Sequence, residues 1–130
     1  LTAFLAEIGV HPVLVATGGR DKGFTAAVAR ACGDLVPAPL SVRDGVDFFD
    51  IAAEAANLEP DLLVGHSKGY RYARQWKVPL VRVGFPVHDR FGGQRVRHLS
   101  YGGAQALFDR VVNAVLARTQ DACPVGYGYL

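Results

Sequence analysis

The middle of the chain has the pattern of a catalytic serine. Residues 65–69 read G-H-S-K-G, a literal G-x-S-x-G placed between an apolar run and a helix pattern, as a nucleophile elbow requires. Asp89 and His98 follow in the Ser…Asp…His order of α/β hydrolases. The alternative is a polar turn in which Ser67 caps the helix and the glycines supply unusual backbone angles. We favour the turn, because Tyr70 replaces the usual small residue and too few strands precede the elbow, and keep a serine hydrolase fragment as an alternative.

A Gly-rich turn near the start of the chain could bind a phosphate. Thr17-Gly18-Gly19-Arg20 follows an apolar run and precedes a helix pattern, so its backbone N–H groups could cradle an anion. It matches neither G-x-G-x-x-G nor the P-loop pattern. We therefore expect a tight turn between a strand and a helix.

Histidines and cysteines give no recognisable metal-ligand spacing. His66, His88 and His98 could converge with Asp89 on loops that follow neighbouring strands, which would make a plausible metal set. No H-x-x-x-H pattern supports that set, and we assign no metal ligands. The two cysteines lie far apart in the sequence, unlike the clustered ligands of zinc or iron–sulfur sites. With no secretory signal, we expect reduced thiols in a cytoplasmic protein.

A long polar loop follows the apolar run Leu80–Val83. In open α/β sheets, ligands bind outside the carboxyl ends of the strands, so this loop is where a site is expected. Its arginines could hold an anion by charge-assisted hydrogen bonds. The alternative for each is a solvated rim or an ion pair with Asp89 or Asp109. The arginines concerned are Arg82, Arg90, Arg95 and Arg97.

The elements that would position these residues alternate between strands and helices. We expect strands at 10–16, 35–37, 61–65 and 80–83. We expect helices at 2–8, 24–32, 70–77 and 103–118, and one that Asp44 or Asp47 caps and that ends at Asn57. The last helix should bury Ala106, Leu107, Val111, Ala114 and Val115, and the tail 124–130 should lie along a surface. The alternation predicts an α/β fold: a three-layer, Rossmann-like or flavodoxin-like domain with a parallel sheet of about four strands in the order 2-1-3-4.

Composition limits the function classes. A chain of 130 residues is expected to form a single domain, here residues 1–130. Half of the residues are hydrophobic, but no apolar run approaches the length of a membrane span. The net charge of +2 comes without a nucleic-acid-binding motif, so neither a membrane nor a nucleic acid is expected as a partner. The chain starts with Leu1, inside a helix pattern without a cap, so we expect a fragment of a longer polypeptide.

Three segments in the second half resemble a known family. Residues 84–90 read G-F-P-V-H-D-R, residues 101–104 read Y-G-G-A, and residues 107–116 read L-F-D-R-V-V-N-A-V-L. Together they resemble the C-terminal domain of nitrogenase component 1 proteins, on the beta-type side of that family. The resemblance covers most of the chain. Ser100 stands where the family usually has Gly before the Tyr.

The resemblance implies a subunit that packs on a paralogous alpha-type subunit, in a heterotetramer, around an iron–sulfur or iron–molybdenum cluster. The basic loop and the tail 124–130 favour a scaffold in iron–molybdenum cofactor biosynthesis over the catalytic beta subunit, an oxidoreductase. A related tetrapyrrole reductase shares the architecture. The reductase iron protein would be a further partner. The loop residues His88, Arg90, Arg95 and Arg97 would shape the cluster cavity, with Arg90 at or near the position of a cofactor-ligating His of alpha-type subunits. The cluster-binding cysteines belong to an earlier domain, so the isolated chain is expected to bind no cluster and to be inactive.

Overall fold

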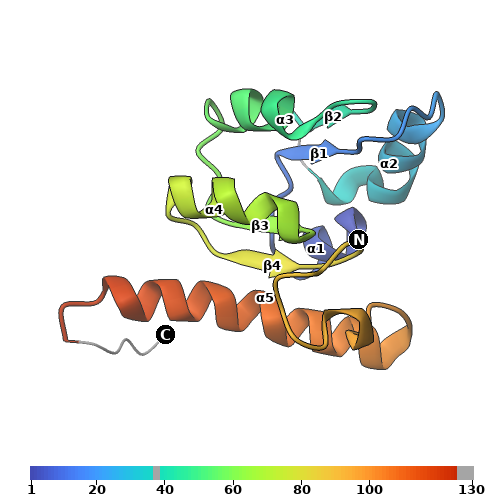
Figure 1. Cartoon of the computed structure of the whole chain (residues 1–130). Helices are drawn as coiled ribbons and strands as arrows, with labels where there is room; N and C mark the ends of the chain where they lie inside the picture. Colours follow the sequence, from blue (N-terminus) through green and yellow to red (C-terminus); the bar gives the residue numbers. More distant parts are fainter. Residues whose placement is uncertain (37–38, 126–130) are drawn as a thin grey trace. The chain divides into compact units, whose positions relative to one another are not determined.

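The computed structural model describes residues 1–36 and 39–125 and divides into two compact units (Figure 1). The first unit is Leu1–Pro60 and the second is Asp61–Leu130. The prediction that residues 1–130 form a single domain stays a prediction.

The first unit contains one pair of parallel strands and three α-helices over its described residues. β1 (Leu14–Ala16) pairs with β2 (Ser41–Arg43), with Leu14 opposite Ser41. The helices are α1 (Thr2–Glu7), α2 (Phe24–Cys32) and α3 (Phe48–Ala55), and a 3-10 turn, η1 (Gly33–Leu35), follows α2. The buried apolar side chains of this unit are Leu5, Val28, Cys32 and Ala55.

The second unit contains a second parallel pair. β3 (Leu63–Gly65) pairs with β4 (Leu80–Arg82), with Leu63 opposite Leu80. Two helices, α4 (Tyr70–Trp76) and the long α5 (Ser100–Ala122), and two 3-10 turns, η2 (Ser67–Gly69) and η3 (Gly93–Arg95), complete it. The buried apolar side chains are Ala73, Val81, Val83, Leu107 and Val111. β4 and α5 are in contact, so the segment that joins them starts and ends on packed elements.

Local sequence signals explain where several helices begin and end. Asp47 caps α3: its carboxylate accepts hydrogen bonds from the backbone N–H groups of Phe49 (2.7 Å) and Asp50 (3.0 Å). The Asp50 carboxylate accepts from the N–H of Asp47 in return, which completes a capping box. Of the two caps that the sequence offers, Asp47 is therefore the one used. Gly9 follows α1 at φ +84°, a backbone angle that glycine adopts at no steric cost.

The predicted fold class is confirmed at the level of mixed helices and parallel strands, but the single four-stranded sheet is not. The described strands form two separate two-stranded sheets. The second described strand lies at Ser41–Arg43. Of the predicted strand 35–37, Leu35 ends a 3-10 turn and Val36 belongs to no strand, and residue 37 lies outside the described residues. The polar–apolar–polar order of Ser41, Val42 and Arg43 is a weak strand signal, because so short a segment also occurs in loops.

The last helix is longer than predicted and buries fewer residues. α5 extends to Ser100 and Ala122, and Leu107 and Val111 are buried as expected. Ala106 is exposed and Val115 is 44% exposed, so these two positions were assigned to the wrong face. No helix in the described ranges combines the length and hydrophobicity that crossing a membrane requires. The surface position expected for the tail falls partly on residues 126–130, outside the described residues.

Replacing Ser100 with glycine is expected to stabilise the chain by about 1 kcal/mol. Ser100 has φ +66°, the left-handed region, where a Cβ is unfavourable. Urea unfolding followed by circular dichroism measures the change in the free energy of unfolding. The matched control is Gln105→Gly, an exposed position inside α5, which should cost up to about 1 kcal/mol. Equal destabilisation by both variants would contradict the strain at Ser100.

Candidate functional site

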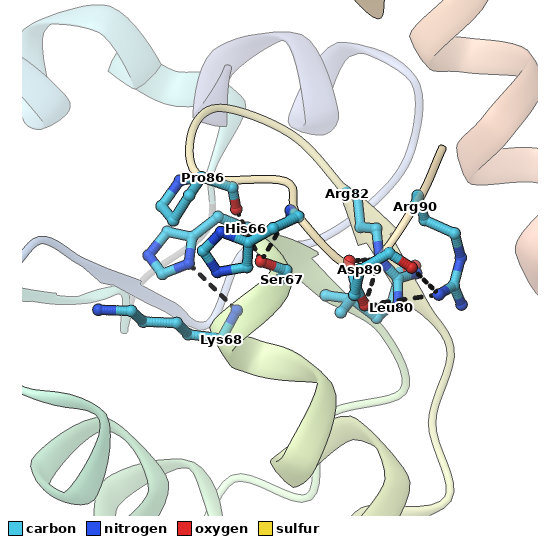
Figure 2. Close-up of polar contacts among 9 residues, drawn as sticks. His66, Ser67, Lys68, Leu80, Arg82, Pro86, Asp89 and Arg90 are labelled. Atoms are coloured by element: carbon cyan, nitrogen blue, oxygen red, sulfur yellow. Dashed lines mark hydrogen bonds and ion pairs between the residues drawn. The ribbon is translucent and has the colours of Figure 1, made fainter. Parts of the chain in front are cut away.

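The candidate site is the segment between β4 and α5, residues 83–99, which we call the β4–α5 loop. Its first part is tied to the turn after β3 (Figure 2). The Ser67 hydroxyl donates a hydrogen bond to the carbonyl oxygen of Pro86 (2.8 Å), and the Ser67 backbone N–H donates to the same oxygen (3.1 Å). The His88 N–H points at the Ser67 hydroxyl (3.5 Å). Ser67 therefore fixes this loop to the ends of both strands.

These contacts bear on the serine-nucleophile hypothesis. Ser67 is 7% exposed, and its proton goes to a backbone carbonyl rather than to an imidazole. Asp89 is paired with Arg82, and the Nε2 atom of His98 is buried without a hydrogen-bond partner. The hydrogen bonds of Ser67, Asp89 and His98 in the described structure do not connect the three residues to one another. The arrangement supports the interpretation of residues 65–69 as a turn, in which Ser67 holds the backbone of the β4–α5 loop in place.

A serine-reactive fluorophosphonate probe is expected to leave the chain unlabelled. The Ser67 hydroxyl is buried and lacks a hydrogen-bonded base that would raise its nucleophilicity. Gel fluorescence after incubation with the probe measures labelling, with Ser67→Ala as the matched variant. Labelling of the wild type that disappears in Ser67→Ala would restore the hydrolase alternative.

An ion pair holds the middle of the loop to β4. The guanidinium of Arg82 donates from Nε to both carboxylate oxygens of Asp89 (2.9 and 3.0 Å) and from Nη2 to one of them (2.6 Å). Arg90 also lies near Asp89, 3.5 Å from its carboxylate (Figure 2). The Arg82 and Arg90 guanidiniums also lie 5.5 and 6.0 Å from the centre of the Tyr70 ring. The ion pairs predicted as alternatives for these two arginines are thus found with Asp89.

The pKa of Asp89 is lowered, first by the hydrogen bonds from Arg82 and then by the charges of Arg82 and Arg90. A carboxylate whose pKa is lower in the folded state stabilises the fold above its unfolded pKa of about 4, and this stabilisation is lost as the pH falls through the folded pKa. We expect the difference in unfolding free energy between wild type and Asp89→Asn to be constant above about pH 5 and to narrow below about pH 4. Urea unfolding at a series of pH values measures it. A difference that does not change with pH would contradict the pairing.

The histidines do not gather into a metal site in the described structure. His66 accepts a hydrogen bond at Nδ1 from the backbone N–H of Lys68 (3.3 Å). Burial lowers the pKa of His66, helped by the charges of Lys68 and His88. Over residues 1–36 and 39–125, no three His, Cys, Asp or Glu side chains form a group that could hold a metal ion. The convergence with Asp89 considered from the sequence is therefore not found. Cys32 and Cys123 are not linked by a disulfide.

The exposed part of the loop is basic and aromatic. His88, Arg90, Arg95 and Arg97 are all exposed, which leaves these predicted residues accessible to a ligand or partner. The Arg95 guanidinium lies 5.4 Å from the ring centre of Phe91, a side chain that is itself fully exposed.

One charged residue near the loop, Arg110, was not predicted from the sequence as a site residue. Arg110 lies on α5, between the buried positions Leu107 and Val111, and its guanidinium donates from Nη1 to the carbonyl oxygen of Arg82 (2.8 Å). A cation on the apolar side of a predicted helix was the available signal, because such positions seldom carry a charge without a role.

In the Gly-rich turn of the first unit, backbone N–H groups donate to polar side chains of the same unit. The N–H of Gly19 donates to the Thr17 hydroxyl (3.2 Å), and the N–H of Gly23 donates to the Asp21 carboxylate (2.8 Å). The N–H of Asp21 donates to the carboxylate of Asp44 (3.2 Å). Two carboxylates among these donors would repel a phosphate, so the arrangement supports a tight turn.

Comparison with known proteins connects this loop to a family. Residues 1–116 match the family described as Nitrogenase component 1 type Oxidoreductase. The nitrogenase iron-iron protein beta chain of Rhodobacter capsulatus is 35% identical over 90% of this chain and 26% of that protein. The nitrogenase molybdenum-iron protein beta chain of Clostridium pasteurianum is 30% identical over 95% of this chain and 27% of that protein. The nitrogenase iron-molybdenum cofactor biosynthesis protein NifN of Rhodobacter capsulatus is 35% identical over 63% of this chain and 18% of that protein.

A solved structure agrees with these sequence matches. Nitrogenase Cp1 at pH 6.5 superposes with a TM-score of 0.91 and 28% sequence identity, covering 99% of this chain and 28% of that one. The chain spans about a quarter of the length of the beta chains that it matches. The matches cover both units and the β4–α5 loop, and the resemblance inferred from the sequence is confirmed. The chain belongs to the nitrogenase component 1 type oxidoreductase family.

Proposed function

We propose that this chain is the C-terminal domain of a beta-type nitrogenase subunit, and that the whole protein packs on an alpha-type paralogue around a metallocluster. One observation supports the catalytic subunit over the scaffold. Both relatives from Rhodobacter capsulatus are 35% identical to this chain, but the beta chain matches 90% of it and NifN only 63%. The basic loop and the tail favour the scaffold from the sequence alone, and this difference in coverage favours the catalytic subunit over it.

The loop geometry supports a role beside an anionic cluster rather than as its ligand. The described residues offer no set of metal ligands, whereas the loop presents several guanidinium groups on a backbone fixed by Ser67 and Asp89. Guanidinium groups stabilise anions by charge-assisted hydrogen bonds. We therefore assign Arg90, Arg95 and Arg97 to the surroundings of the cluster, together with His88. On this proposal, the chain alone binds no cluster and is inactive.

The scaffold in iron–molybdenum cofactor biosynthesis is the second candidate. The basic character of the β4–α5 loop favours it, because a scaffold has to receive and release an anionic cofactor. The proposed location of either protein is the cytoplasm, and the reductase iron protein is a proposed partner of the catalytic subunit.

Acetylene reduction separates the two candidates. The native protein is purified without oxygen, with whatever copurifies, and assayed with added reductase component and reductant. Reduction above the level without reductase is expected of the catalytic subunit. Iron without any acetylene reduction, in a preparation where an authentic nitrogenase control is active, would favour the scaffold instead.

A further inference from the structure

A pocket of about 280 Å³ lies beneath the β4–α5 loop, within the second unit. Its lining includes three arginines, Arg82 from β4, Arg90 from the loop and Arg110 from α5. Apolar side chains, among them Val87 and Val96, form the rest of the wall. Apolar walls with a few polar groups are typical of small-ligand sites.

Arg110, which contributes to the wall of this pocket, has one donor without a hydrogen-bond partner. Its Nη1 donates to the carbonyl of Arg82 (2.8 Å) and its Nε to the carbonyl of Ala106 (3.2 Å). Its Nη2 is buried and has no hydrogen-bond partner. Burial also lowers the pKa of Arg110, as expected for a cation that is partly removed from water. A buried donor without a partner is costly to the fold, and a bound water, ion or ligand group is one explanation for such a donor.

The charge of the pocket is unbalanced. Asp89 pairs with two of the three guanidiniums: Arg82 donates to both of its oxygens, and Arg90 lies 3.5 Å from one of them. The ion pairs found over the described residues leave Arg110 without an acidic partner. One carboxylate against three guanidiniums leaves a formal charge of +2, which favours binding of an anion.

We propose that this pocket binds a carboxylate group through Arg110. A carboxylate has two oxygens in one plane, which match the planar fork of a guanidinium. The guanidinium of Arg110 would pair with the carboxylate, with Arg90 at the pocket wall adding charge. The carboxylate belongs either to a free small organic acid or to an Asp or Glu side chain of a protein partner. Only the second source rests on the proposed assembly with a paralogous subunit.

Isothermal titration with glutarate tests the proposal on the full native polypeptide, first separated from its partner and then within the complex. Glutarate presents the carboxylate of a Glu side chain and is small enough to model a free acid. Sodium chloride at matched ionic strength controls for screening of the arginine charges. Arg110→Gln removes the fork, and Arg110→Lys retains the charge without the fork. Arg118→Gln is the matched control, because Arg118 lies on the same helix but pairs with Asp61 outside the pocket.

The separated wild type and Arg118→Gln are expected to bind one glutarate per chain saturably. The dissociation constant should rise at least tenfold in Arg110→Gln and by less in Arg110→Lys. Binding that disappears in the complex would identify the partner's carboxylate as the ligand, and binding that persists there would identify a free acid. The proposal would be overturned if the separated wild type shows no saturable binding. It would also be overturned if the wild type, Arg110→Lys and Arg110→Gln all bind glutarate with the same dissociation constant. Acetylene reduction does not enter this test, so its failure and that of the proposed function are distinguishable.

Discussion

Replacing Arg82 with methionine is expected to lower the free energy of unfolding by about 2–3 kcal/mol. The Arg82 side chain is 14% exposed and donates three hydrogen bonds to Asp89. Methionine fills a similar volume but leaves the Asp89 carboxylate, which is 27% exposed, with only the more distant charge of Arg90. A poorly paired carboxylate at a partly buried position costs more than an exposed pair contributes.

The matched control is Arg43→Met in the first unit. Arg43 also donates to a carboxylate, that of Glu54 (2.9 Å), but its side chain is 55% exposed. We expect a clearly smaller loss there, because solvent screens an exposed pair. Urea unfolding measures both variants, and a cycle with Asp89→Asn isolates the pair itself. Losses of equal size at Arg82 and Arg43 would show that the loop is not held by the Arg82–Asp89 pair.

Replacing Gly93 with alanine is the second large effect expected, at about 2–3 kcal/mol of lost stability. A Cβ on Gly93 would lie 2.5 Å from Cγ1 of Val87, 2.6 Å from its carbonyl oxygen and 2.8 Å from its Cβ. The carbonyl oxygen belongs to backbone and cannot turn aside as a flexible side chain could. The added methyl group would therefore push η3 away from the first part of the β4–α5 loop.

Gly102→Ala is the control for this substitution. A Cβ at Gly102 would meet no atom within 4 Å, and the residue lies inside α5. Alanine favours helix over glycine, so we expect a gain of up to about 1 kcal/mol. Thermal unfolding measures both variants. A Gly93→Ala protein as stable as the wild type would mean that η3 and Val87 are not packed as described.

The sequence predicted the local elements well where a strong signal marks their ends. The prediction that Asp44 or Asp47 caps a helix and the prediction of a helix at 24–32 needed no knowledge of distant residues. Pairing between strands depends on residues far apart in the sequence, and strands of three residues carry little pattern. For this reason the strand at Ser41–Arg43 was missed and a single sheet was expected.

For the candidate site too, local features were predicted from the sequence and contacts between distant segments were not. The sequence placed the β4–α5 loop and its exposed arginines, because a polar segment after an apolar strand is visible in one stretch of chain. It did not show that Ser67 donates to Pro86 or that Arg110 reaches the carbonyl of Arg82. Those contacts join segments that only the folded chain brings together, so a G-x-S-x-G pattern could suggest a nucleophile where the structure has a structural serine.

The central claim is that the whole protein is a metallocluster subunit paired with a paralogue, and one measurement tests it most directly. The native protein is purified without oxygen from its source, its iron content is quantified, and its copurifying chains are identified by mass spectrometry. We expect iron together with an alpha-type paralogue in equal amount. A pure, folded protein with neither iron nor a paralogous partner would contradict the claim.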